Sequence, residues 1–384
     1  MSGQASGPPP GSPARALETS TRSSPSPAGA AEVVLSIRAL GKSYGATFAL
    51  RGVDLEIRRG ELLTLLGPSG SGKTTLLKLI AGFEAPSSGR VLLHGRDISR
   101  LSPARRGLGM VFQHYALFPH MTVAQNVGYG LKLRRVARAE RERRVGEMLA
   151  LLRLDGLGER YPRQLSGGQQ QRVALGRALA YDPEVILMDE PLGALDRSLR
   201  IELEEQIRGV HRELGATIVY VTHDQREALA LSDRIAVMRD GALAGVGAPA
   251  ELYRLPPDGF VASFFAAANL LEVQAHELLG DGRARVRCGG CEIACPVTAP
   301  EGSPVALAVR RRSLRRAGTA GDLRVAGVVS EMVLLGDEQE IALRTPLLGR
   351  IVAVLDERGC AGIALGQELE LFAPAQETVL VAAL

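Results

Sequence analysis

Residues 67–74 read Gly-Pro-Ser-Gly-Ser-Gly-Lys-Thr, a glycine-rich segment that ends in Lys and Thr. It follows an apolar run, Leu62–Leu66, that predicts a buried strand, and a helical pattern over Thr74–Ala81 begins directly after the glycines. Glycines in a strand–loop–helix context let consecutive backbone N–H groups converge on phosphate oxygens at a helix N-terminus. We expect Lys73 to contact the β- and γ-phosphates, Thr74 to offer its hydroxyl to Mg2+, and Thr75 to reach another phosphate oxygen.

A second apolar run, Val185–Met188, ends in Asp189 and Glu190. The carboxyl ends of buried parallel strands form the ligand-binding edge of an α/β sheet, so we expect both carboxylates beside the phosphate loop. Asp189 is predicted to orient Mg2+, directly or through water, and Glu190 to polarise the attacking water as general base. A solvated strand end is the alternative for an isolated Asp-Glu pair, and the phosphate loop disfavours it.

A third motif, Ser166-Gly167-Gly168-Gln169, begins a predicted helix. Taken alone it is a capping box followed by a tight turn. The same free N–H groups at a helix start can also bind a γ-phosphate. Together with the phosphate loop and Asp189-Glu190, in this order, the motif resembles the signature sequence of the ATP-binding-cassette family.

The resemblance assigns roles to further residues. Tyr44 matches the aromatic residue that stacks on adenine, and Gln113 matches the glutamine that senses Mg2+ and water beside the transmembrane contact. Asp196 matches the aspartate of a loop that bridges subunits, and His223 matches the switch histidine that contacts the γ-phosphate and steadies the catalytic glutamate. Gly193 stands where the family more often has Ser, a departure that affects no catalytic role.

The resemblance implies ATP and Mg2+ as cofactors and the following residue sets. The expected catalytic residues are Glu190, His223 and Gln113, and the expected Mg2+ ligands are Thr74, Gln113 and Asp189. The expected ATP-binding residues are Tyr44, Gly67, Pro68, Ser69, Gly70, Ser71, Gly72, Lys73, Thr74, Thr75, Ser166, Gly167, Gly168, Gln169 and Asp196. Residues 166–169 of one copy are expected to close over ATP held by residues 67–75 of another, so each site is complete only on closure.

Composition divides the chain of 384 residues into three segments. Residues 1–31 are rich in Pro, Ser, Gly and Ala, lack the pattern of a secretory signal, and predict a disordered tail. Residues 32–265 alternate strand-like and helical patterns, which predicts an α/β domain of the P-loop NTPase (ABC) type with a helical subdomain. Residues 266–384 contain short apolar segments separated by Gly, Pro or Asp, and predict a small all-β domain of the oligonucleotide/oligosaccharide-binding type.

The charge of the chain argues against nucleic acid as a partner. The net charge is +4, yet Lys is nearly absent and the Arg residues are scattered among Glu and Asp. No stretch of about 18 apolar residues runs without a charge or a breaker, so no membrane span is predicted.

Three cysteines, Cys288, Cys291 and Cys295, lie close enough for a metal site or a redox pair. No His lies among them, so a fourth metal ligand would have to be Cys360 or a carboxylate. The alternation of residues around them fits strands that carry small apolar side chains, which is the structural interpretation we favour. Metal binding stays open at this point.

The remaining sequence resembles bacterial importers. Residues 249–271 resemble the junction in importer ATPase subunits, and the β region after it resembles their transport-associated domain. Phe112–Val127 is especially similar to the polyamine (spermidine/putrescine) branch, and Leu62–Gly70 and Pro191–Asp196 favour the same branch. The resemblance implies an ATPase that converts ATP to ADP and phosphate to drive polyamine import, with ferric-iron, phosphonate or sulfate import as alternatives. The solute itself should touch other subunits.

Partners and location follow from the same resemblance. It implies two transmembrane permease subunits docked near Gln113 and Tyr115–Pro119, a second copy of this chain, and an extracytoplasmic solute-binding protein. It places the chain peripherally on the cytoplasmic face of the bacterial plasma (inner) membrane. A soluble cassette ATPase acting on nucleic acid or ribosomes is disfavoured, because neither a long coiled coil nor a second cassette is present. The C-terminal β domain is alternatively a regulatory module.

Overall fold

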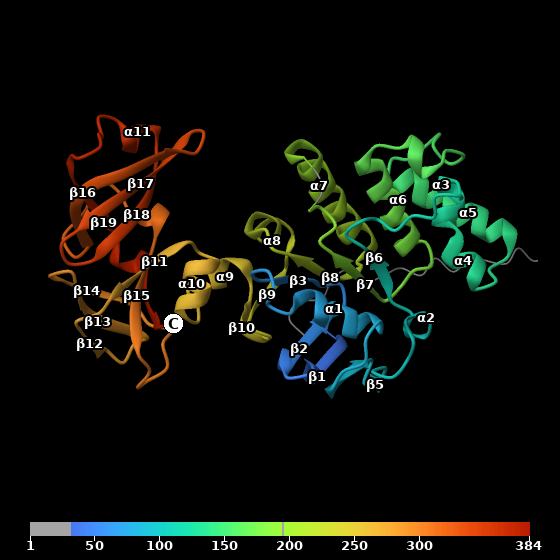
Figure 1. Cartoon of the computed structure of the whole chain (residues 1–384), viewed down its shortest axis with the longest axis horizontal. Coiled ribbons are helices and arrows are strands. Elements are labelled where there is room, and N and C mark those ends of the chain that lie inside the picture. Colours follow the sequence, from blue (N-terminus) through green and yellow to red (C-terminus); the bar gives the residue numbers. More distant parts are fainter. Residues whose placement is uncertain (1–31, 194–195) are drawn as a thin grey trace, which may run out of the picture. The chain divides into compact units, whose positions relative to one another are not determined.

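A six-stranded, mostly parallel sheet positions the phosphate loop (Figure 1). The computed structural model describes residues 32–193 and 196–384, so the tail predicted at 1–31 lies outside the described residues. The strand order is β10-β9-β3-β8-β7-β6, in which β3, β6, β7, β8 and β9 run parallel and β10 is antiparallel to β9. The bounds are β3 Leu62–Leu66, β6 Gly109–Val111, β7 Val185–Asp189, β8 Thr217–Thr222, β9 Arg234–Arg239 and β10 Ala242–Gly247.

The central strands are buried along nearly their whole length. Every residue of β3 and β8 is buried, as is β7 up to Asp189, so their continuous apolar runs are those of a sheet covered on both faces. Because the neighbouring strands are parallel, their carboxyl ends meet at one edge. The loop at 67–72 leaves that edge from β3 and leads into α1 (Lys73–Ala81), one residue earlier than the sequence pattern indicates.

An antiparallel sheet packs against α1 and carries the N-terminal strands. Its order is β2-β1-β4-β5, with bounds β1 Val33–Tyr44, β2 Thr47–Arg58, β4 Ser88–Leu93 and β5 Arg96–Asp97. Leu35 and Ile37 of this sheet share one buried cluster with Leu76 and Leu77 of α1 and with Leu63 of β3. The helix that follows the phosphate loop therefore packs against residues of both sheets.

The predicted helical subdomain lies between β6 and β7, at the green helices of Figure 1. Its helices are α3 Val123–Val127, α4 Tyr129–Leu133, α5 Arg138–Leu151 and α6 Gly167–Leu179, with α2 (Pro103–Arg106) before β6 and a short 3-10 turn at Pro162–Gln164. The helices after β7 are α7 Arg197–Leu214, α8 Gln225–Leu231, α9 Pro249–Arg254 and α10 Gly259–Phe264. In the described part of the chain, no helix combines the length and hydropathy that crossing a lipid bilayer requires.

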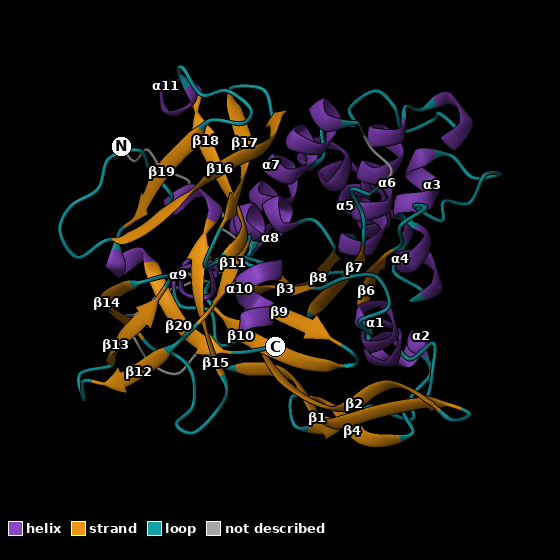
Figure 2. Ribbon diagram, turned by 60° about the vertical axis from the view of Figure 1, so that its left-hand side comes forward, coloured by secondary structure: helices purple, strands orange, loops and turns teal. Residues whose placement is uncertain are grey.

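After α10 the chain is almost entirely strands, the orange arrows around β11–β20 in Figure 2. Three sheets form, in the orders β11-β15-β20, β12-β13-β14 and β18-β17-β16-β19. The bounds are β11 Ala268–Glu272, β12 Ala275–Leu278, β13 Arg283–Cys288, β14 Cys291–Pro296, β15 Val305–Arg310, β16 Leu323–Leu334, β17 Glu338–Thr345, β18 Gly349–Asp356, β19 Glu368–Ala373 and β20 Thr378–Ala382, with α11 at Glu357–Cys360. The predicted fold class, an α/β P-loop domain followed by a small all-β region, is confirmed. The boundary at 265/266 stays a prediction, since residues 33–384 form one compact unit by their contacts.

Cys288, Cys291 and Cys295 lie on the hairpin of β13 and β14, as their alternation predicts, whereas Cys360 ends α11. Cys288 and Cys295 are buried, Cys291 is partly buried, and all are free thiols. Among the described residues, no group of three or more His, Cys, Asp or Glu side chains is arranged to hold a metal ion.

Candidate functional site

The loop at 67–72 curls around the amine of Lys73. The Lys73 Nζ donates to the carbonyl oxygens of Gly67 at 2.8 Å and Pro68 at 2.9 Å, and the residue is only 5% exposed. Gly72 has a φ of 101° and forms the N-cap of α1, a left-handed conformation that favours glycine. Burial lowers the pKa of Lys73, while the carboxylates of Glu190 and Asp189 oppose the shift. The loop thus holds a cation at the N-terminus of a helix, the arrangement that binds phosphate.

Asp189 ends β7 and faces this loop. Its carboxylate interacts with the Thr74 hydroxyl, and Lys78 and Lys73 are close enough to lower its pKa. Burial nevertheless raises the pKa of Asp189, and repulsion from Glu190 adds to the rise. A carboxylate and a hydroxyl brought together beside a phosphate loop are the oxygen donors that Mg2+ prefers, so these residues fit the predicted metal.

Glu190 is held between two side chains from the neighbouring strand ends. Its Oε1 lies 3.2 Å from the Nδ1 of His223, and its Oε2 lies 3.3 Å from the Nε2 of Gln113, which donates to it. Gln113 follows β6 and His223 follows β8, the two strands that flank β7. The backbone of Glu190 has a φ of 41°, and its N–H donates to the Val221 carbonyl oxygen at 3.0 Å. A non-glycine residue in this region is strained, and such strain is typical of functional sites.

Two of the three residues predicted as catalytic, Gln113 and His223, therefore converge on the carboxylate of the third, Glu190. A carboxylate in this position has a hydrogen-bond donor on one oxygen and an imidazole on the other, which leaves it oriented at the edge of the phosphate loop. This is the arrangement that a general base for an attacking water needs.

Tyr44 lies at the end of β1 with its ring half exposed, at 50%. Its hydroxyl donates to Glu84, and the Lys42 Nζ lies 4.9 Å from the ring centroid and 3.5 Å from the Glu84 carboxylate. The bond to Glu84 raises the pKa of Tyr44, and the Thr75 side chain interacts with the same hydroxyl. The predicted adenine-stacking ring is thus tied to the phosphate loop. The sequence did not predict Lys42 and Glu84 as site residues, because only the folded chain brings them into contact with Tyr44.

The motif at 166–169 and Asp196 act as helix caps within this chain. The Ser166 Oγ accepts from the Gln169 N–H at 3.3 Å, and the Gln169 Oε1 accepts from the Ser166 N–H at 3.0 Å, which is a complete capping box. Asp196 caps α7 by accepting from the Leu199 N–H at 3.0 Å. No hydrogen bond among the described residues joins Ser166, Gln169 or Asp196 to the loop at 67–75. Their contact with a nucleotide stays a prediction about a second copy.

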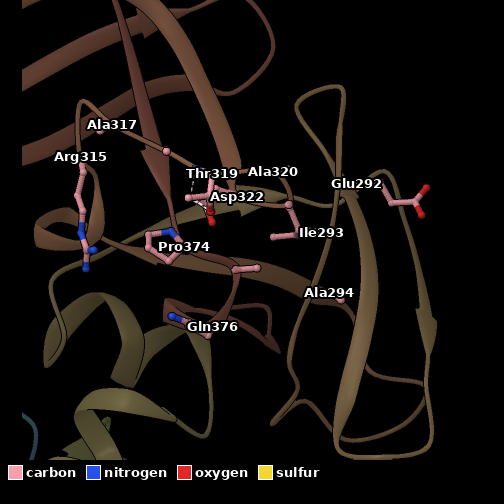
Figure 3. Close-up of a pocket in the computed structure, with 13 residues that line it drawn as sticks. Glu292, Ile293, Ala294, Arg315, Ala317, Thr319, Ala320, Asp322, Pro374 and Gln376 are labelled. Atoms are coloured by element: carbon pink, nitrogen blue, oxygen red, sulfur yellow. Dashed lines mark hydrogen bonds between the residues drawn. The ribbon is translucent and has the colours of Figure 1, made fainter.

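A separate hollow of about 590 Å3 lies in the C-terminal β region (Figure 3). It is lined largely by the small residues of the loop at 317–322 and by Pro374 and Gln376. Figure 3 shows Arg315 and Glu292 at opposite ends of it, and Asp322 hydrogen-bonded to Thr319. Its charged groups do not converge on one point, unlike those at the strand ends of the large sheet.

The sequence is similar to known transport ATPases. The profile of a family described as "ABC transporter" matches residues 50–193. The spermidine/putrescine import ATP-binding protein of Rubrobacter xylanophilus is 46% identical over 84% of this chain and 86% of its own length. The protein of the same description from Thermobifida fusca is 47% identical over 81% of this chain and 83% of its own. A sulfate/thiosulfate import ATP-binding protein of Thermosynechococcus vestitus is 54% identical, over 62% of this chain and 70% of its own.

Two solved structures share the cassette fold. An ATP-binding cassette solved as a dimer in a post-hydrolysis state with ADP and Pi gives a TM-score of 0.51 and 34% identity, covering 56% of this chain and 98% of that one. The cbiO1 protein of Clostridium perfringens, part of the ABC transporter complex cbiONQ, gives a TM-score of 0.54 and 32% identity, covering 58% of this chain and 91% of that one.

Proposed function

Because the chain belongs to the ATP-binding-cassette family and is an ABC-type ATPase, we propose that it energises the import of a polyamine such as spermidine or putrescine. Relatives described as polyamine import ATP-binding proteins extend over both the cassette and the β region, which supports this solute class. We assign residues 32–265 to the nucleotide-binding domain and residues 266–384 to the transport-associated β domain.

The position of Glu190 carries the proposed mechanism. Glu190 takes a proton from the attacking water, while Gln113 and His223 hold its two carboxylate oxygens in place. Lys73 and the backbone N–H groups of residues 69–75 bind the phosphates, and Tyr44 stacks on the adenine. Thr74, Gln113 and Asp189 would hold Mg2+ bound with ATP, and the ion would supply positive charge to neutralise the phosphate oxygens.

A second copy completes each site in this proposal. Residues 166–169 sit at the start of a 13-residue helix, α6, and would present its N-terminus to the γ-phosphate of the ATP bound by the other copy. Asp196, at the start of α7, bridges the two copies. The pair docks on two permease subunits at the cytoplasmic face of the inner membrane, and an extracytoplasmic solute-binding protein completes the system.

An uptake assay tests the solute assignment. In cells lacking the gene for this chain, uptake of radiolabelled spermidine and putrescine should fall to background and return with the wild-type gene. A gene carrying Glu190→Gln should not restore it. Uptake of sulfate, ferric iron, phosphonate and sn-glycerol 3-phosphate in the same cells is the control. Lost sulfate uptake with intact polyamine uptake would favour the alternative suggested by the sulfate/thiosulfate relative.

A further inference from the structure

The buried carboxylate of Glu227 is hydrogen-bonded, directly or through one side chain, to the residues on both sides of His223. The Thr222 hydroxyl donates to the Glu227 Oε2 at 2.7 Å, and the same Thr222 oxygen accepts from the backbone N–H of Asp224 at 3.0 Å. The residues before and after His223 are therefore linked to each other and to Glu227. The imidazole itself lies 3.2 Å from Glu190.

Glu227 lies in the core, and no hydrogen bond among the described residues joins it to the phosphate loop or to Glu190. It is 2% exposed on α8, and its Oε2 also accepts from the hydroxyl of the fully buried Tyr220 at 2.9 Å. Burying a carboxylate costs free energy, and apolar side chains of similar volume often fill such positions without loss of stability. Two hydroxyl donors on one oxygen define a direction for the carboxylate, which indicates a role in positioning.

The same carboxylate is linked to α7. Arg200, in the first turn of that helix, lies 3.3 Å from the Asp224 Oδ2 and 3.8 Å from the Glu227 Oε1. Asp224 also caps α8 by accepting from the Arg226 N–H at 2.7 Å. The helix that begins after Asp196 and the segment that carries His223 therefore share one ionic cluster.

We propose that Glu227 is a positioning residue for ATP hydrolysis. It fixes Thr222 and Asp224 so that His223 is aimed at Glu190, and Arg200 couples this geometry to the start of α7. The inference rests on the role of His223 in the proposed function. In addition, the buried Glu227 sets the orientation of His223 through Thr222 and Asp224.

Three variants separate positioning from mere stability. Glu227→Ala removes the acceptor, and kcat for ATP hydrolysis should fall about 10- to 100-fold while KM stays nearly unchanged, because the nucleotide-binding groups are untouched. Thr222→Val deletes the hydroxyl that links Asp224 to Glu227 and should act in the same direction. Glu227→Gln keeps an oxygen that accepts from both hydroxyls, so its kcat should stay within about 3-fold of wild type. Glu213→Gln, on the exposed end of α7, is the matched control and should change nothing.

The rates should be expressed per nucleotide-binding site, so that misfolded protein is not counted. The double variant Glu227→Ala/His223→Ala should be no slower than His223→Ala alone, because both remove the same interaction. Wild-type kcat in Glu227→Ala or Thr222→Val, or additive losses in the double variant, would overturn the inference. An inactive His223→Ala beside an active Glu227→Ala refutes only the positioning role. A fully active His223→Ala refutes the proposed role of His223 and the positioning inference with it.

Discussion

At the scale of single residues, two glycines near the nucleotide site differ in what an added side chain would meet. A Cβ at Gly67 would lie 2.4 Å from the Met238 carbonyl oxygen, whereas a Cβ at Gly193 would have nothing nearer than 3.5 Å. Gly67→Ala must shift the phosphate loop at a cost of about 1–3 kcal/mol, so the Kd for ATP should rise about tenfold. Gly193→Ser should keep the ATPase rate within about twofold, since an ordinary contact costs little.

Nucleotide binding by calorimetry and steady-state ATPase rates check this pair. The family more often has Ser at the position of Gly193, and the space around it is consistent with that substitution. Wild-type ATP affinity in Gly67→Ala would contradict the role given to close packing under the loop.

At the scale of elements, a buried arginine closes the C-terminal end of α1. Arg106 is 2% exposed and donates to the carbonyl oxygens of Leu79, Ile80, Ser99 and Leu101 at 2.6–2.9 Å. Arg106→Met leaves these carbonyls without their donor, so the free energy of unfolding should fall by about 3 kcal/mol. Urea unfolding measures the change, and Arg105→Met, at the exposed neighbouring position, is the control. Equal midpoints for the two variants would contradict this capping role.

The hairpin of β13 and β14 makes a prediction about thiol reactivity. Burial raises the pKa of Cys288 from the ordinary 9.0 to about 11, with the nearby thiols of Cys291 and Cys295 adding to the shift. At pH 8 the thiolate is scarce, so native Cys288 should resist iodoacetamide while the partly buried Cys291 reacts. Mass spectrometry of the labelled peptides checks this, with urea-unfolded protein, in which all thiols react, as the control. Equal labelling of Cys288 and Cys291 in the native protein would contradict it.

The raised pKa of Cys288 also makes the free energy of unfolding depend on pH. The folded-state pKa of Cys288 lies above the unfolded value, so its contribution to stability is complete below about pH 9 and is lost as the pH rises towards about 11.

The positions of several strands, loops and helix starts could be predicted from the local sequence. The apolar runs at β3 and β7, the glycine loop and the capping box at Ser166 each carry a local physical signal, and the structure places elements there. The order β3-β8-β7-β6 carries no such signal, since it depends on long-range packing. That order is what brings Gln113 and His223 to Glu190, so their convergence was expected from family resemblance alone.

The sequence did not predict contacts made by residues that belong to no recognisable motif. Glu84 at the Tyr44 hydroxyl and Glu227 behind Thr222 are ordinary acidic residues in sequence, and only the folded chain gives them partners. The roles of Ser166 and Asp196 depend on a second copy, which one chain does not contain.

At the scale of the whole molecule, the composite site predicts that activity depends on concentration. If each ATP needs the helix start of another copy, specific ATPase activity should rise with chain concentration as dimers form. Light scattering with ATP present reports the dimer in parallel. Lys73→Ala, which removes the cation inside the loop, should be inactive at every concentration. Constant specific activity across a range in which the protein is monomeric would contradict the composite site.

Single-turnover hydrolysis of pre-bound ATP shows whether Glu190 is the general base of the ATPase. Glu190→Gln keeps the size of the side chain and removes its basicity, so ATP should bind with unchanged Kd while the hydrolysis rate falls about 100-fold or more. Hydrolysis by Glu190→Gln at the wild-type rate would contradict the account.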